Sequence, residues 1–228
     1  MKYFLISDVH GHYTEMVEAL KEKGFDSSNV DHQLIILGDL FDRGTENLKV
    51  LEYVYDLLEK GKVLLIKGNH DDFFYDSGSL EWNIERNGFD KTIMEFFDFS
   101  IAKHGLSNYE LLNAVLESQP KLQKVLKAMV DKIIIDDKYV LIHGGLSLGQ
   151  PDNWCNTERW IWVGVNEYDD KTYIFGHWGA YQLNKKFKGV HEDAPFIYKN
   201  YIGIDNTVVL TKKVFVYIIE SENSKGEE

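Results

Sequence analysis

The sequence predicts a layered α/β protein that folds as one unit and carries a helical insert. Short aliphatic runs alternate with stretches of helical periodicity near the start of the 228-residue chain. Residues 73–130 then show helical stripes without a convincing strand, and the rest of the chain is mostly β in pattern. We therefore expect a single domain over residues 1–219, with the helical insert at about 73–130.

The expected strands are short runs of β-branched and aliphatic residues, which is typical of strands buried on both faces. Three precede the insert, at Tyr3–Ile6, Gln33–Leu37 and Val63–Ile66. The others follow it, at Lys132–Ile135, Tyr139–Ile142, Tyr173–Phe175, Ile202–Ile204, Thr207–Leu210 and Val214–Ile219. Only residues 211–213 separate the last two runs, which is short enough for a hairpin.

The expected helices show apolar residues at spacings of three and four. One helix contains Tyr13, Met16, Val17 and Leu20 and should stop at Gly24; the next contains Leu51, Val54, Tyr55 and Leu58 and should stop at Gly61. Inside the insert we expect three stripes, formed by Ile93, Phe96 and Phe97, by Leu111, Leu112, Val115 and Leu116, and by Leu122, Val125, Leu126 and Met129.

The composition is that of an ordinary soluble globular protein, with 44% apolar and 27% charged residues. The single cysteine, Cys155, excludes an internal disulfide and a thiolate metal cage, so we expect a reducing, cytoplasmic location. No segment approaches the roughly 20 apolar residues of a membrane span. The net charge of −12 disfavours nucleic acid and anionic membranes as general partners. We expect residues 220–228 to form a polar, disordered tail.

Five of the apolar runs end in glycine together with aspartate, asparagine or histidine. The motifs are DVHG at 8–11, GDLFDRG at 38–44, GNHD at 68–71, HGG at 143–145 and GH at 176–177. In open α/β sheets, sites form at the carboxyl ends of strands, so these polar residues should converge on one crevice. Each motif alone is typical of a turn, a surface ion pair or a histidine near the core. The spaced ensemble favours a functional site.

The chemistry of these side chains fits two divalent metal ions. Carboxylate oxygen and imidazole nitrogen suit manganese, iron or zinc. Asp8 and His10 could chelate one ion. The second ion could be held by Asn69, His143 and His177, and Asp39 could bridge both.

On these motifs the chain resembles the calcineurin-like metallophosphoesterases, and within them the phosphoprotein phosphatases of the short bacterial and phage-lambda type. The most specific match is GDLFDRG to the family pattern G-D-x-x-D-R-G. The resemblance implies a β-sandwich flanked by helices. It implies one metal at Asp8, His10 and Asp39, and another at Asp39, Asn69, His143 and His177. It also implies His70 as general acid, Asp42 as the residue that orients it, and Arg43 as a phosphate clamp.

One part of the sequence departs from the pattern of that family. Many short bacterial members carry an arginine in a W-x-R string, and Gly164 stands in its place here. Arg159 is our candidate substitute for binding substrate, although a surface ion pair with Glu158 explains it equally well. Trp178, with Trp154, Trp160 and Trp162, could stack on a nucleobase or belong to the core.

Three functions remain open from the sequence. The leading hypothesis is a metal-dependent phosphomonoesterase acting on phosphoserine, phosphothreonine or phosphotyrosine, in which a water shared by two metals attacks phosphorus and His70 protonates the leaving oxygen. The alternative is a nucleotide enzyme resembling the symmetrical dinucleoside tetraphosphate hydrolases. A non-catalytic binder of phosphorylated partners is less consistent with the intact ligand set.

Overall fold

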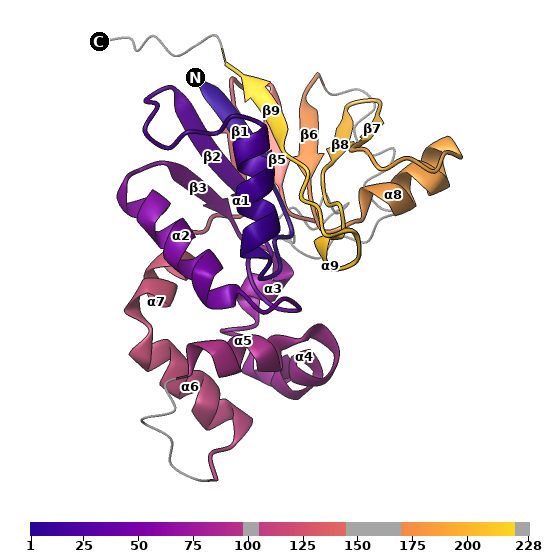
Figure 1. The fold of residues 1–228 in the computed structure, drawn as a ribbon. Helices are drawn as coiled ribbons and strands as arrows, with labels where there is room; N and C mark the ends of the chain where they lie inside the picture. Colours follow the sequence, from indigo (N-terminus) through magenta and orange to yellow (C-terminus); the bar gives the residue numbers. More distant parts are fainter. Residues whose placement is uncertain (98–104, 145–169, 222–228) are drawn as a thin grey trace.

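The structure consists of two mixed β-sheets with helices on their outer faces (Figure 1). It is a computed structural model that describes residues 1–97, 105–144 and 170–221. The first sheet has the order β3-β2-β1-β9, with strands at Lys2–Ile6 (β1), His32–Leu37 (β2), Val63–Ile66 (β3) and Tyr217–Glu220 (β9). The second has the order β4-β5-β6-β8-β7, with strands at Lys132–Ile135 (β4), Tyr139–Ile142 (β5), Thr172–Phe175 (β6), Phe196–Tyr198 (β7) and Tyr201–Gly203 (β8).

Parallel strands lie in the middle of both sheets. β1 pairs in parallel with β2, and β2 with β3; in the second sheet β5, β6 and β8 are also parallel. The carboxyl ends of parallel strands meet at the same edge of a sheet. The loops that follow β1, β2, β3, β5 and β6 are therefore brought together, as the sequence predicts, and the loop after β8 joins them.

The two sheets face each other across a dry aliphatic layer, which confirms the predicted β-sandwich. The inner face of the first sheet contributes Leu5, Ile35 and Leu37, and that of the second contributes Leu141 and Ile174, all with no exposed surface. Alternate residues on the same strands point outward, because side chains alternate between the faces of a strand.

Helices cover these outward faces. Helices α1 (Tyr13–Glu22) and α2 (Asn47–Glu59) pack on the first sheet, where Phe4 and Ile36 are fully buried. The short helix α8 (Ala180–Leu183) and the π-helical turn η3 (Asn184–Lys188) pack on the second sheet. Helix α1 ends just before Gly24, whose φ of +80° suits glycine, as expected from the sequence.

The predicted helical insert lies between β3 and β4 and extends away from the sandwich (Figure 1). In the described part of the chain it holds no named strand. It follows α3 (Asn69–Asp72) and comprises the 3₁₀ turn η1 (Ser77–Ser79), α4 (Leu80–Asn87), α5 (Phe89–Phe96), α6 (Asn108–Ser118) and α7 (Pro120–Lys127). The three apolar stripes expected from the sequence correspond to α5, α6 and α7. Helix α4 was not expected from the sequence.

The prediction of a C-terminal hairpin at residues 207–219 is wrong. Residues Val208–Thr211 form a short helix, α9, and the final strand begins only at Tyr217. The residues flanking this helix, Thr207 and Lys212, have φ of +52° and +55°, so the chain reverses there without strand pairing. The β-branched run favours a strand locally. However, β9 pairs with β1 only from Tyr217 onward.

The helices are short. The longest in residues 1–97, 105–144 and 170–221 is α2, with 13 residues. None of the described helices has both the length and the apolar character needed to cross a membrane. The cytoplasmic location inferred from the sequence stays a prediction, as do the single-domain boundaries and the polar tail, most of which lies outside the described residues.

We expect Ile174→Ala to lower the free energy of unfolding by about 2–5 kcal/mol, since it leaves a cavity between the sheets. The matched control is Ile197→Ala on β7, whose side chain is 51% exposed. It should cost less than about 0.5 kcal/mol. Urea denaturation measures the free energy of unfolding of both variants, and a chelator in the buffer excludes any contribution from metal binding. Equal losses for the two variants would contradict the assignment of the core.

Candidate metal centre

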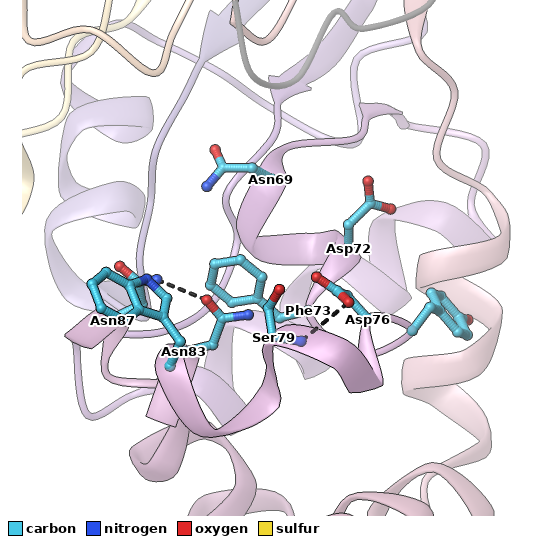
Figure 2. Close-up of a pocket in the computed structure, with 9 residues that line it drawn as sticks. Asn69, Asp72, Phe73, Asp76, Ser79, Asn83 and Asn87 are labelled. Atoms are coloured by element: carbon cyan, nitrogen blue, oxygen red, sulfur yellow. Dashed lines mark hydrogen bonds between the residues drawn. The ribbon is translucent and has the colours of Figure 1, made fainter. Parts of the chain in front are cut away.

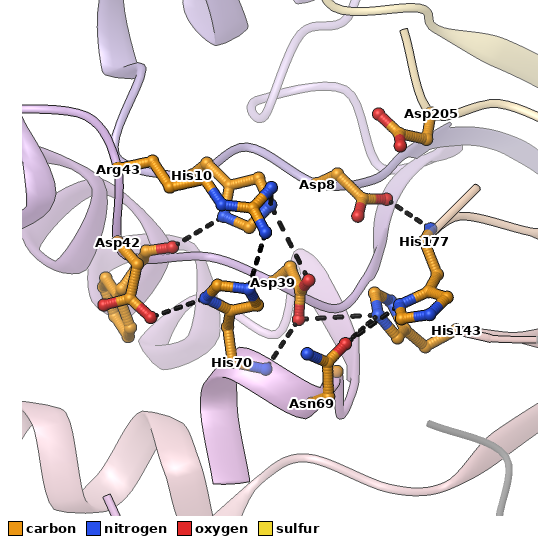
Figure 3. A network of polar contacts seen from close by, with 12 residues as sticks. Asp8, His10, Asp39, Asp42, Arg43, Asn69, His70, His143, His177 and Asp205 are labelled. Atoms are coloured by element: carbon orange, nitrogen blue, oxygen red, sulfur yellow. Dashed lines mark hydrogen bonds and ion pairs between the residues drawn. The ribbon is translucent and has the colours of Figure 1, made fainter. Parts of the chain in front are cut away.

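The loops after β1 and β2 run side by side and carry the first group of polar residues. Three backbone bonds join them: Asp8 N to Gly38 O at 3.1 Å, His10 N to Asp39 O at 3.0 Å, and Gly11 N to Leu40 O at 2.9 Å. These bonds bring Asp8, His10 and Asp39 to one place, as predicted (Figure 3).

Helix α3 is locked onto the same loops through Asp71. Its carboxylate accepts hydrogen bonds from the backbone N–H groups of Asp39 (2.9 Å), Leu40 (3.1 Å) and Gly68 (2.8 Å). In return, the backbone N–H of His70 donates to Asp39 Oδ1 at 2.9 Å. Burial and the nearby Asp39 raise the pKa of Asp71 to about 7. The sequence shows Asp71 within its motif but does not reveal this role.

The second sheet supplies two histidines from the ends of β5 and β6. Their loops are joined by a bond from Gly176 N to His143 O at 2.9 Å. Both rings approach the amide of Asn69: its Oδ1 lies 3.1 Å from His143 Nε2 and 2.9 Å from His177 Nδ1. The predicted grouping of Asn69, His143 and His177 is therefore present in the fold.

Asp39 lies between the two groups and is only 2% exposed. Its Oδ2 is 3.7 Å from His10 Nε2, and its Oδ1 is 3.5 Å from His143 Nε2. The structure contains two sets of possible ligand atoms, and within each set all atoms lie within 4.8 Å of one another. Asp39 belongs to both sets. The first set adds His10 and His70, and the second adds His143 and His177. This geometry is what a bridging carboxylate requires.

Asp8 and His70 are placed differently from the simplest ligand scheme. The carboxylate of Asp8 belongs to neither of these two sets; its Oδ2 accepts a hydrogen bond from the backbone N–H of His177 at 2.9 Å. His70 belongs to the first set although the sequence predicts a general acid there. The assignment of Asp8 as a ligand and of His70 as an acid stays a prediction.

The orientation of the histidines fits metal ions. His10 Nδ1 lies 2.9 Å from the carbonyl of Phe41, and His143 Nδ1 lies 2.6 Å from the carbonyl of Leu37. A proton on Nδ1 satisfies the carbonyl, so Nε2, which faces Asp39, is the nitrogen that would bind a metal ion. Together with carboxylate and amide oxygens, this donor set fits two divalent ions of the manganese, iron or zinc type.

Two glycines are required by close approach. A Cβ atom at Gly68 would fall on the carboxylate of Asp39, and one at Gly176 would fall on Asp8 and Ser7. Any larger residue would push these carboxylates out of position. The glycines beside the predicted ligands therefore have a steric function.

The backbone of the centre is strained. Left-handed φ values, which non-glycine residues adopt at a cost in free energy, occur at Asp8, His10, Asp39, Asp42, Arg43 and His177. They are six of the eleven such residues in the described segments. Strain of this kind clusters at functional sites, where the surrounding structure holds it in place.

Burial and mutual charge control ionisation in the centre. Burial opposes the charged form of Asp39, but His143 and His70 together hold its pKa well below the usual range. Burial alone would lower the pKa of His143, whereas Asp39 and Asp8 raise it to about 10. Burial and the neighbouring His143 lower the pKa of His177 to about 3. The cluster therefore concentrates negative charge at Asp39 and keeps His177 neutral.

His70 is held by a carboxylate from the neighbouring loop. Its Nδ1 lies 2.7 Å from Asp42 Oδ2, and both side chains are buried. Burial raises the pKa of Asp42 despite this contact. Thr92, from α5 of the insert, donates to the other oxygen of Asp42. The insert thus supports the predicted orienting residue, a contact that the sequence did not reveal.

Arg43 reaches over the first set of ligands. Its Nη1 lies 3.1 Å from His10 Nε2 and its Nη2 lies 3.0 Å from His70 Nε2. A planar guanidinium in this position can bind two oxygens of a phosphate group. This placement is consistent with its predicted function as a clamp.

Two further residues belong to the surroundings of the centre. Asp205 follows β8 and is 6% exposed; burial is the main cause that raises its pKa to about 6. Asp205 directly follows an apolar run, so the pattern used for the other strand ends could have identified it from the sequence. His12 is only 7% exposed, and its Nδ1 lies 2.7 Å from the carbonyl of His10.

Some predictions fall on residues outside the described part of the chain. Arg159 and Gly164 are among them, so the substitute clamp stays a prediction. The same holds for Trp154, Trp160 and Trp162. Trp178 is described: its ring lies 4.8 Å from that of His177, and it packs against the outer core of the second sheet.

A family model described as calcineurin-like phosphoesterase matches residues 1–205. Among curated proteins, an asymmetrical bis(5'-nucleosyl)-tetraphosphatase of Bacillus velezensis is 36% identical over 81 residues, which are 33% of this chain and 32% of the relative. A symmetrical bis(5'-nucleosyl)-tetraphosphatase of Buchnera aphidicola is 34% identical over 148 residues, covering 64% of this chain and 45% of the relative. The chain thus spans less than half the length of these two relatives.

Solved structures share the fold at low sequence identity. A cold-active protein-tyrosine phosphatase of a psychrophilic Shewanella has a TM-score of 0.63 at 16% identity, covering 96% of this chain and 75% of the other. A protein serine/threonine phosphatase of Saccharomyces cerevisiae has a TM-score of 0.51 at 14% identity, covering 97% and 80%. At such low sequence identity, these similarities show that the fold is shared and nothing about function.

We expect Asp39→Asn to be the most damaging single ligand change, because both sets of ligands lose the same charged group. Changes in the residues around metal ligands typically cost 10–100-fold in affinity or activity, and a shared ligand should cost about 100-fold or more. Elemental analysis should show loss of bound metal. Added Mn²⁺ should raise the melting temperature of the wild type by mass action and should not raise that of Asp39→Asn.

Asp205→Asn is the matched control, since it changes a buried acid that lies outside both sets of ligand atoms. It should lower activity and metal content less than Asp39→Asn does. If Asp39→Asn kept most turnover while Asp8→Asn and His143→Ala abolished it, the bridging assignment would be wrong.

Proposed function

Because the chain belongs to the calcineurin-like phosphoesterase family, we propose that it is a hydrolase that uses two divalent metal ions at Asp39 and cleaves dinucleoside tetraphosphates. The observation that carries the chemistry is the pair of ligand sets sharing one buried carboxylate. When bound, the ions would supply Lewis acidity and activate the attacking water. Manganese, iron and zinc all suit the donor set.

The ligand residues have distinct functions in this proposal. Asp39 would hold both ions, since its Oδ2 faces His10 and its Oδ1 faces His143. His10 would bind one ion and His143 the other, and a backbone carbonyl fixes each ring. The remaining proposed ligands are Asp8, Asn69 and His177. These groups are buried or half-buried and pre-positioned, so they need little reorganisation during the reaction.

His70 moves the proton in this proposal. Asp42 holds the ring through Nδ1, so Nε2 is the atom that donates to the leaving oxygen. Arg43 lies beside that same nitrogen and would offset charge on the phosphate oxygens. The orienting carboxylate stabilises the protonated ring before transfer.

The substrate assignment rests on the two curated relatives described above, both bis(5'-nucleosyl)-tetraphosphatases. A second cation near Arg43 supports it. The ammonium group of Lys212 lies 3.0 Å from His12 Nε2, and Lys212 and Arg43 line one cavity of about 200 Å³. Among described residues neither cation forms an ion pair with a carboxylate. Glu15 and Glu46 also line the cavity, and Lys49 binds Glu46 at 2.8 Å.

A phosphomonoester, such as a phosphoserine, phosphothreonine or phosphotyrosine protein, is the second candidate. The observation that favours it is the buried pair of Asp42 and His70. A serine alkoxide is strongly basic and cannot leave without a proton, whereas a nucleotide leaving group is only weakly basic. A well-held acid is therefore of most use for an alkoxide.

The test is a panel of substrates offered to the Mn²⁺-loaded protein. We expect the highest kcat/KM on diadenosine tetraphosphate, with lower values on a phosphoserine peptide and p-nitrophenyl phosphate. Chromatography of the nucleotide products distinguishes two ADP from ATP plus AMP. A phosphopeptide cleaved with a higher kcat/KM than the tetraphosphate would favour the second candidate, and full activity after exhaustive chelation would contradict both.

Lys212→Ala should raise the KM for diadenosine tetraphosphate by about tenfold, because one charge-assisted contact is worth roughly 1.5–3 kcal/mol. The KM for p-nitrophenyl phosphate should change much less, since one phosphate group reaches only Arg43. Lys213→Ala is the control: its ammonium binds Asp193 at 3.0 Å. If the KM values for the two substrates changed equally, Lys212 would not bind the phosphate chain and the prediction would be wrong.

His70→Asn should lose most of the roughly 10²–10⁴-fold contribution of general acid catalysis on a phosphoserine peptide. It should lose much less on p-nitrophenyl phosphate, whose leaving group departs unprotonated. Asp42→Asn should show the same pattern more weakly. Metal content decides the assignment: if His70→Asn lowers both activities equally and also loses metal, His70 is a ligand rather than an acid.

A further inference from the structure

A cavity of about 620 Å³ lies next to the metal centre, lined by residues of α3, η1 and α4. Figure 2 shows the ring of Phe73 between Asn69 on one side and Ser79 and Asn83 on the other. Asn69 is also the amide that meets His143 and His177, so the cavity and the metal centre share a wall. Cavities of this size are typical of small-molecule sites. A substrate held at the centre can extend into it.

The cavity contains a buried donor without a partner. Asn83 is 2% exposed, and its Oδ1 accepts a hydrogen bond from Asn87 Nδ2 at 2.8 Å. Its Nδ2 has no hydrogen-bond partner within the described part of the chain. An unpaired buried donor is costly, and an acceptor atom on a ligand would satisfy it.

The other walls suit a flat, uncharged ring. Phe73 and Trp82 provide aromatic surface, and Trp82 is 61% exposed. Asp76 adds a carboxylate whose Oδ1 accepts from the backbone N–H groups of Gly78 (3.1 Å) and Ser79 (3.3 Å). Asp72 also lines the cavity, but its Oδ1 pairs with Lys67 at 3.2 Å. The carboxylate of Asp76 would repel phosphate and can accept from the N–H groups of a base, and aromatic surfaces stack on bases of any sequence.

The position of the cavity relates it to the leaving group. The ring of Phe73 packs on the ring of His70, with 4.5 Å between their centroids. His70 is the group that donates a proton to the leaving oxygen in the proposed reaction. The part of the substrate that departs therefore lies on the side of this cavity.

We propose that this cavity binds the purine base of the leaving nucleotide, with Trp82 stacking on the ring and the buried Asn83 side chain turning toward the cavity so that its Nδ2 donates to a ring nitrogen or carbonyl. The proposal rests on the proposed nucleotide substrate. It adds a site for the base to a centre that otherwise recognises only phosphate.

The experiment measures binding without turnover. The metal-loaded protein is titrated by calorimetry with α,β-methylene-ADP and with methylenediphosphonate, which carries the same non-hydrolysable bridge but no base. We expect the nucleotide analogue to bind at least about tenfold tighter, the size of one hydrogen bond plus stacking. Asn83→Asp, which replaces the donor with an acceptor, should remove most of this difference while methylenediphosphonate still binds.

Trp82→Ala tests the same point at an exposed position, should the buried variant fail to fold, and should also reduce the difference. Tyr109→Ala is its matched control, because Tyr109 on α6 is 55% exposed and lies outside the cavity lining. Equal affinities of the wild type for both probes, or an unchanged difference in Trp82→Ala, would overturn the proposal. Preference for the nucleotide analogue without tetraphosphate hydrolysis would instead reject the proposed substrate and leave the base site standing.

Discussion

The burial of one ionised carboxylate between two sheets is the constraint on which the rest of the site depends. Asp39 is 2% exposed, so its charge must be compensated by neighbouring groups. The backbone N–H of His70 and the rings of His10 and His143 surround it. Gly68 leaves room for its oxygens. The rings of His10 and His143, which make this burial tolerable, also belong to the proposed donor set for two metal ions.

The stability of the sandwich holds this arrangement in place. Left-handed backbone at Asp8, His10 and Asp39 is unfavourable by itself. It persists because β1 and β2 are held in parallel register and buried on both faces, and because Asp71 ties three backbone N–H groups of the neighbouring loops to α3. Core packing, rather than local preference, therefore positions the ligands.

The sheets and the insert divide the chemistry between them. Loops at the carboxyl ends of the strands, together with α3, carry the proposed metal ligands, whereas the insert supports the side from which we propose that the leaving group departs. Thr92 of α5 binds Asp42, which in turn holds His70. Phe73 and α4 form the cavity beside that histidine. A change of insert could thus alter the substrate while the metal centre stays the same.

The sequence by itself determined the layered α/β class, the helical insert and the convergence of Asp39, Asn69 and His143, because apolar strands that end in glycine and a polar side chain carry a local signal for the strands and for the crevice. The β-sandwich followed from the family resemblance of the motifs. Only the tertiary structure decided the helix at Val208–Thr211, where β1 offered no partner to a β-branched run. It also decided the burial of His12 and the unpartnered amide of Asn83. These features depend on which distant segments pack together, and no local pattern of residues encodes that contact.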